Sequence, residues 1–187
     1  MKKSIRMTSL VIIAVAISAI SGCSQGPQKK AQDQEHRPGV AEGVAPVFSD
    51  GPMAAAYEQY IQLKDALVAS DQNKAASSAG SLHTTLQKFS EGGDTAQAAA
   101  VNAAIHAAAI AAATGIDAQR ATFSALSNQM AELIKAADIA SGTVYLTFCP
   151  MANDDQGAYW LANEQEIRNP YFGEKMMKCG VVKSTIQ

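Results

Sequence analysis

The sequence predicts a mainly α fold: an up-and-down four-helix bundle that ends in a C-terminal cap of irregular structure and short β-strands. Apolar residues recur at intervals of three and four over residues 51–137, as they do in helices that pack against one another. Glycines at 92–93 and 115 keep the connections short, which favours antiparallel neighbours. From Gly142 onward, β-branched, aromatic and turn residues predict a different structure.

The first two helices have recognisable starting points. Gly51-Pro52 favours a helix start, because proline suits the first helical position, and helical spacing then continues to Val68 with Lys64 as the one polar residue among apolar ones. Asp71 is expected to cap a second helix. Its seam comprises Ala75, Ala79, Leu82, Leu86 and Phe89.

The third and fourth helices differ in composition. An alanine-rich helix is expected from about Asp94 to Thr114, where small side chains allow close approach but contribute little burial each. Gly115 is expected to stop it, and Asp117 to cap the fourth helix. The apolar face of that last helix comprises Phe123, Leu126, Met130, Leu133, Ile134 and Ala137.

The cap spans residues 142–187. Residues 143–148 have the composition of a strand, 153–157 form a turn, and 158–161 are expected to form a second short strand. A turn-rich aromatic stretch at 169–173 precedes a last short helical piece. That piece carries Met176, Met177 and Cys179.

The first 22 residues are typical of a secretory signal peptide. Lys2, Lys3 and Arg6 precede an apolar run from Leu10 to Ile20, which is shorter than the roughly 20 residues that cross a bilayer. The words Ile20-Ser21-Gly22-Cys23 resemble the bacterial lipobox, in which the cysteine receives lipid after cleavage. This resemblance implies a lipoprotein on the periplasmic side of the cell envelope, and Ser24 favours the outer membrane.

Cleavage would leave an acidic chain on a tether. Removal of three basic residues changes the formal net charge from −2 to −5 and leaves no basic patch for nucleic acid. Residues 23–50 then comprise the lipidated cysteine and a polar, Pro- and Gly-containing segment expected to be a flexible tether. Residues 51–187 are expected to form one domain by their length.

Sulfur is concentrated in the cap. Excluding Cys23, the processed chain has seven sulfur atoms, and five of them belong to Cys149, Met151, Met176, Met177 and Cys179. Thiolate and thioether ligands select Cu(I) over hard cations. The sequence therefore predicts a site for Cu(I) or Ag(I), to which His83 and His106 are additional candidate ligands because imidazole also suits copper.

Structural explanations of these residues remain open. Cysteines in an oxidising compartment are commonly bridged, so Cys149 and Cys179 are equally candidates for a disulfide. Methionines also fill gaps beside aromatic rings. A single histidine on a helix flank is more often a hydrogen-bonded structural residue than a ligand.

Long stretches of the chain resemble a poorly characterised bacterial periplasmic helical domain. The most specific are 149–152, 157–161, 167–173 and 176–180. That domain of unknown function occurs alone behind a signal, or at the C-terminus of adaptor subunits of heavy-metal (copper or silver) RND efflux pumps. The resemblance implies metal handling, with Cys149, Met151, Met176 or Met177, and Cys179 as the residues carried over.

The sequence contains no recognisable catalytic set, and we expect no enzyme. It lacks a Cys-x-x-Cys pair, a glycine-rich phosphate loop and a His-Glu-x-x-His motif.

These observations leave two expected functions. One is a lipid-anchored protein that binds Cu(I) or Ag(I) as an accessory to efflux or homeostasis; the other is a disulfide-stapled module that docks onto an efflux-pump or envelope protein without metal.

Overall fold

Four α-helices make up most of the part of the chain that the structure describes, as the sequence predicts. The computed structural model describes residues 44–91 and 95–187, so the expected signal peptide, Cys23 and most of the expected tether lie outside the described residues. The helices are α1 (Gly51–Val68), α2 (Gln72–Gln87), α3 (Thr95–Ala112) and α4 (Ile116–Ala136), and a 3₁₀ turn, η1 (Lys88–Glu91), follows α2.

The helix ends confirm one expected cap and correct another. The Asp71 side chain accepts a hydrogen bond from the Lys74 N–H at 2.9 Å, as expected of an N-cap. Asp117 is not the cap of α4, because the helix begins one residue earlier, at Ile116, after Gly115 with φ 121°. Glycine adopts this conformation without strain. Asp117 lies in the first turn, where its charge favours the helix dipole.

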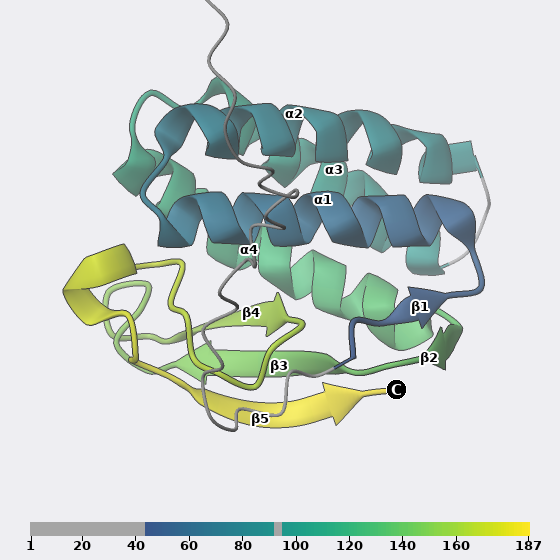
Figure 1. The fold of residues 1–187 in the computed structure, drawn as a ribbon. Coiled ribbons are helices and arrows are strands. Elements are labelled where there is room, and N and C mark those ends of the chain that lie inside the picture. The colour runs from purple at the N-terminus through teal and green to yellow at the C-terminus, as the bar shows by residue number, and fades with distance from the viewer. Residues whose placement is uncertain (1–43, 92–94) are drawn as a thin grey trace, which may run out of the picture. The chain divides into compact units, whose positions relative to one another are not determined.

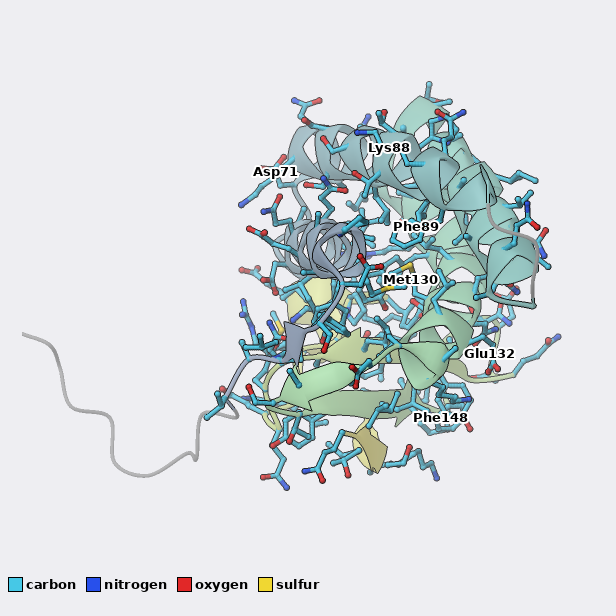
Figure 2. All side chains as sticks on the ribbon, turned by 90° about the vertical axis from the view of Figure 1, so that its right-hand side faces the viewer. Asp71, Lys88, Phe89, Met130, Glu132 and Phe148 are labelled. Atoms are coloured by element: carbon cyan, nitrogen blue, oxygen red, sulfur yellow. The ribbon has the colours of Figure 1, made fainter. Side chains whose placement is uncertain are left out.

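Each helix packs against the next one along the chain, and α4 also packs against the sheet. In Figure 1, α1 and α4 lie between the strands and the other two helices. The Met130 side chain points between the helices in Figure 2 and is fully buried. Other large side chains that are fully buried in the bundle include Tyr60, Leu63, Leu67, Leu82, Phe123 and Leu126. None of the described helices combines the length and hydropathy needed to span a bilayer.

The cap is built on a three-stranded antiparallel sheet. Strands β3 (Val144–Cys149) and β4 (Ala158–Ala162) match the two expected strands closely. The third, β5 (Val181–Ile186), was not predicted, and it pairs with β3 to give the order β4-β3-β5. The last helical piece is shorter than expected: η2 (Gly173–Met176) is a single 3₁₀ turn, and Cys179 lies beyond it.

The folded domain already includes residues before Gly51. Strand β1 (Val47–Phe48) pairs with β2 (Ile139–Ser141) after the end of α4. The Phe48 side chain is buried, and its ring centroid lies 5.2 Å from that of Tyr57. The last residues of the expected tether therefore belong to the folded domain, because an aromatic side chain and a strand partner hold them there.

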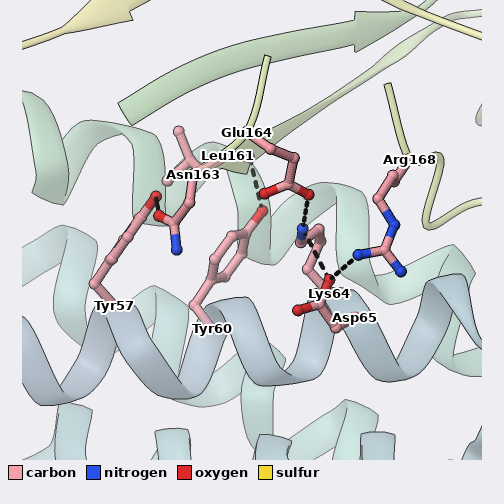
Figure 3. Close-up of polar contacts among 8 residues, drawn as sticks. All are labelled: Tyr57, Tyr60, Lys64, Asp65, Leu161, Asn163, Glu164 and Arg168. Carbon is pink, nitrogen blue, oxygen red and sulfur yellow. Dashed lines mark hydrogen bonds and ion pairs between the residues drawn. The ribbon is translucent and has the colours of Figure 1, made fainter. Parts of the chain in front are cut away.

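A buried charged cluster joins α1 to the segment after β4 (Figure 3). Lys64 has 0% of its surface exposed, and its Nζ lies 2.5 Å from Glu164 Oε1 and 2.9 Å from Asp65 Oδ1. A buried ammonium group needs such partners, because its desolvation is costly. Arg168 Nη1 lies 3.7 Å from the same Asp65 oxygen. The polar residue that interrupts the apolar face of the first helix is thus an anchor for the cap.

Two tyrosines continue this seam along α1. The Tyr60 hydroxyl lies 2.8 Å from Ser127 Oγ on α4 and accepts a hydrogen bond from the Leu161 N–H at 3.1 Å. The Tyr57 hydroxyl donates to Asn163 Oδ1 at 2.9 Å. Burial raises the pKa of both phenols well above the usual value, so both remain neutral donors and acceptors. One helix therefore holds β4 and the residues after it through side chains one turn apart.

Removing one partner of Lys64 tests this anchor. We expect Glu164→Gln to lower the free energy of unfolding by about 1–3 kcal/mol, because it leaves a buried ammonium with a single carboxylate. Lys64→Met should cost less, since the Glu164 side chain is 27% exposed and Arg168 Nη1 remains 3.7 Å from the buried Asp65 Oδ1. Urea unfolding measures both, with Glu132→Gln in the exposed pair with Lys135 as the matched control. A Glu164→Gln effect no larger than the control would contradict the anchor.

Candidate thiol and metal site

The two cysteines of the cap, expected as metal ligands or as a disulfide, lie against each other. Cys149 ends β3, and Cys179 stands two residues before β5; Phe148 and Val181 are paired across the antiparallel ladder, so these ends are adjacent. The two Sγ atoms are 2.6 Å apart, and the cysteines are not bridged. Cys149 is fully buried, while Cys179 is half-buried.

The residue after Cys179 must be glycine for this approach. Gly180 has φ 147°, and a Cβ on it would lie 2.7 Å from Trp160 Cη2 and 3.2 Å from the Phe148 carbonyl oxygen. A larger residue would push the backbone away from β3. Because residue 180 is glycine, the backbone between Cys179 and β5 can pass close to the Trp160 ring.

Asn169 holds the Cys179 segment from the other side. Its Nδ2 donates to the Cys179 carbonyl oxygen at 2.8 Å, and its backbone N–H donates to the Met177 carbonyl oxygen at 2.9 Å. Its Oδ1 accepts from the Tyr171 N–H at 2.8 Å. Asn169 is fully buried, so these bonds have no competition from water. One amide side chain therefore ties the aromatic turn to the cysteine.

The three candidate methionines are connected to the cysteine segments through their backbones. The Met151 N–H donates to the Cys179 sulfur, and the Met151 side chain is 47% exposed. Met176 is linked to Cys179 through a turn, in which its carbonyl oxygen accepts the Cys179 N–H at 3.0 Å. Met176 and Met177 are both half-buried. All three thus belong to the turns that hold the cysteines.

The two candidate histidines are not brought to the cysteines. His83 Nδ1 lies 2.9 Å from the Ala104 carbonyl oxygen, which makes it a link between α2 and α3. His106 lies on α3 and is half-buried. Figure 1 shows both helices on the side of α1 and α4 away from the strands. Across residues 44–91 and 95–187, no three His, Cys, Asp or Glu side chains lie close enough together to hold a metal ion.

The immediate surroundings keep the Cys179 thiol protonated. Its hydrogen bond to Cys149 raises the pKa of the Cys179 thiol, burial and the charge of Cys149 raise it further, and only the Met151 N–H lowers it.

Tyr171 lies beside the cysteine pair, and its hydroxyl donates to the Tyr159 carbonyl oxygen at 2.5 Å. Burial raises the pKa of this hydroxyl well above the usual value. The Tyr171 ring packs against Phe123 and Trp160 at centroid distances of 5.7 and 6.0 Å.

Comparison with known proteins finds a match to one family model, over part of the chain. Residues 56–142 match the model of a family described as "Protein of unknown function (DUF3347)". This match covers most of the bundle and ends before Cys149, so it carries no statement about the thiol pair. No curated protein and no solved structure matches the chain.

Several residues that shape this site were not predicted from the sequence. Asn169 was assigned only to a turn, and Gly180 and β5 were given no role. The run of β-branched residues in Val181–Ile186 is the signal that predicts a strand there. No local pattern indicates that Asn169 is buried against Cys179, because the two are brought together only by the fold.

Asn169→Ala tests how the Cys179 segment is held. We expect the free energy of unfolding to fall by about 1–3 kcal/mol, because buried donors and an acceptor lose their partner. Cys179 should then react faster with a thiol reagent in the folded protein. Thermal unfolding and timed alkylation measure the two effects, and Asn128→Ala on the exposed face of α4 is the control. Unchanged alkylation together with unchanged stability would contradict the role of Asn169.

Proposed function

We propose that the protein is a lipoprotein anchored on the periplasmic side of the cell envelope through Cys23, where it binds a soft metal ion. Cu(I) or Ag(I) is the expected ion, and metal efflux or homeostasis the process that it assists. The observation that carries this proposal is the contact between Cys149 and Cys179, with Met151 bonded to the same sulfur through its backbone. The resemblance to domains of copper and silver efflux adaptors supports it.

The residues fit such an ion by their chemistry. Two thiolates and a thioether are soft ligands, which Cu(I) prefers and which hard cations do not. Metal–thiolate bonds are about 2.3 Å long for zinc, so two sulfurs 2.6 Å apart would have to separate to admit an ion. The turns at Met151 and Met176 would have to yield for this; Met151 lies two residues after β3, and Met176 is the last residue of η2.

Protons should compete with the metal. Because the pKa of the Cys179 thiol is raised, Cys179 is protonated at neutral pH and must lose that proton on binding. Affinity for Cu(I) should therefore increase as the pH rises toward that raised pKa, and decrease on acidification.

A disulfide-stapled docking module is the second candidate function. The 2.6 Å distance between the sulfurs favours it, because oxidation would form a bridge between β3 and the start of β5 with little movement. In that case the aromatic cap would present a fixed surface to an efflux or envelope partner. Thiol counting on the denatured, lipidated protein, in which lipid blocks the Cys23 sulfur, separates the candidates: two free thiols are expected for a metal site and none for a staple.

Cu(I) titration of the reduced full chain against a chromogenic chelator tests the metal directly. We expect one equivalent to bind, and the double variant Cys149→Ser/Cys179→Ser to bind at least ~10-fold more weakly. Met151→Leu should weaken binding to a smaller extent. Met53→Leu, a buried methionine of α1, is the matched control and should change nothing. Retention of copper by the double variant would refute the thiolate site.

Lipidation is tested separately. Cys23→Ser should abolish incorporation of a labelled fatty acid and release the protein from the membrane fraction, because the lipid is the proposed anchor. Cys179→Ser is the control and should leave both unchanged. Membrane retention of the Cys23→Ser chain would show that another segment anchors it.

A further inference from the structure

The thiol pair of Cys149 and Cys179 is arranged for oxidation as well as for metal binding. Its two sulfur atoms are 2.6 Å apart, and a disulfide bond is about 2.05 Å long, so bond formation shortens this distance by only about 0.5 Å. A metal ion between the sulfurs would instead force them apart, because each metal–sulfur bond is about 2.3 Å long. As folded, the pair is therefore closer to a two-electron donor than to a preformed chelate.

The fold restricts the oxidants that this pair can use. Cys149 is fully buried and Cys179 is half-buried, so an oxidant reaches the pair only through Cys179. The surroundings raise the pKa of the Cys179 thiol, which lowers the thiolate fraction that attack on a disulfide or a peroxide requires. A metal ion avoids this restriction, because its own charge displaces the proton from a thiol that coordinates it. A small metal ion is therefore the favoured oxidant.

Met151 favours copper among the metal ions that accept electrons. Its backbone N–H donates to the Cys179 sulfur, and its side chain is 47% exposed. A thioether is a soft ligand that selects Cu(I), and oxidation of the two thiols does not consume it. The turn that holds the thiols thus also carries a ligand for the reduced copper ion.

We propose that the protein reduces Cu(II), with the thiol pair as the electron donor. Two Cu(II) ions each take one electron. The S–H bonds of Cys149 and Cys179 break, one S–S bond forms between the two sulfur atoms, and two protons pass to water. The products are two Cu(I) ions and a disulfide that joins the end of β3 to the segment before β5. This inference rests on the proposed function for the arrival of copper, and adds the oxidation state in which copper arrives.

Anaerobic reduction of Cu(II) tests the proposal. The full chain carries Cys23→Ser, so that Cys149 and Cys179 are its only thiols, and Cu(II) is added with an excess of a chromogenic chelator specific for Cu(I). We expect two Cu(I) ions per chain, loss of both thiols, and a disulfide within one chain, identified by peptide mass mapping without reductant. A single Cu(I) ion per chain, or disulfides only between chains, would overturn the proposal.

Two controls separate electron transfer from other causes of thiol loss. Zn²⁺ binds thiolates but has no redox chemistry, so it should leave both thiols intact after its removal. The variant Cys179→Ser/Thr84→Cys keeps two thiols and places one of them on the exposed side of α2. It should reduce Cu(II) at least ~10-fold more slowly, because the thiols are no longer held together. Circular dichroism confirms that the variant folds, and a rate equal to that of the parent would refute the role of the pair.

This test distinguishes failure of the inference from failure of the proposed function. The chelator removes Cu(I) as it forms, so reduction is measured even if the chain retains no copper. Cu(I) titration of the reduced chain measures retention without electron transfer. Binding of Cu(I) without reduction of Cu(II) would overturn the inference alone, whereas reduction without retention would support it and overturn only the proposed binding of Cu(I).

Discussion

The burial of one ammonium group constrains the whole arrangement of bundle and cap. Lys64 lies on the face of α1 that otherwise packs apolar residues, and its charge can be accommodated there only because Glu164 and Asp65 reach it. Glu164 lies two residues after the end of β4, so its pairing with Lys64 holds the chain that leaves β4 against α1. The hydroxyls of Tyr57 and Tyr60 satisfy polar groups of the same segment. A cap of limited apolar area is thereby held in register by polar contacts.

This register has a chemical consequence at the opposite end of the sheet. With β4 held on α1 and β3 paired to it, the end of β3 and its Cys149 are buried. The return of the chain through Asn169 and Gly180 then brings Cys179 to the same point. Three segments that are distant in sequence thus bring the two thiols together. Cys149 is buried and Cys179 is half-buried, so the two sulfur atoms differ in their access to a metal ion or an oxidant.

The two sides of the bundle serve different purposes. The side of α1 and α4 supports the sheet, whereas α3 lies on the other side with an uncharged surface. The thiol pair belongs to the cap on the α1 and α4 side, away from the α3 surface.

The sequence by itself determined the helices and the two strands of the cap, because periodicity, glycines and an Asp cap act over a few residues. Asp71 is an example, since a cap needs only its own helix. It also indicated the sulfur-rich segment, whose composition is visible without a fold. Tertiary structure alone decided that Lys64 is an anchor, that Cys149 and Cys179 meet while His83 and His106 do not, and that β5 exists as a partner of β3. These depend on which distant surfaces come into contact, and the free energy of such contacts resides in burial and pairing that no local pattern records.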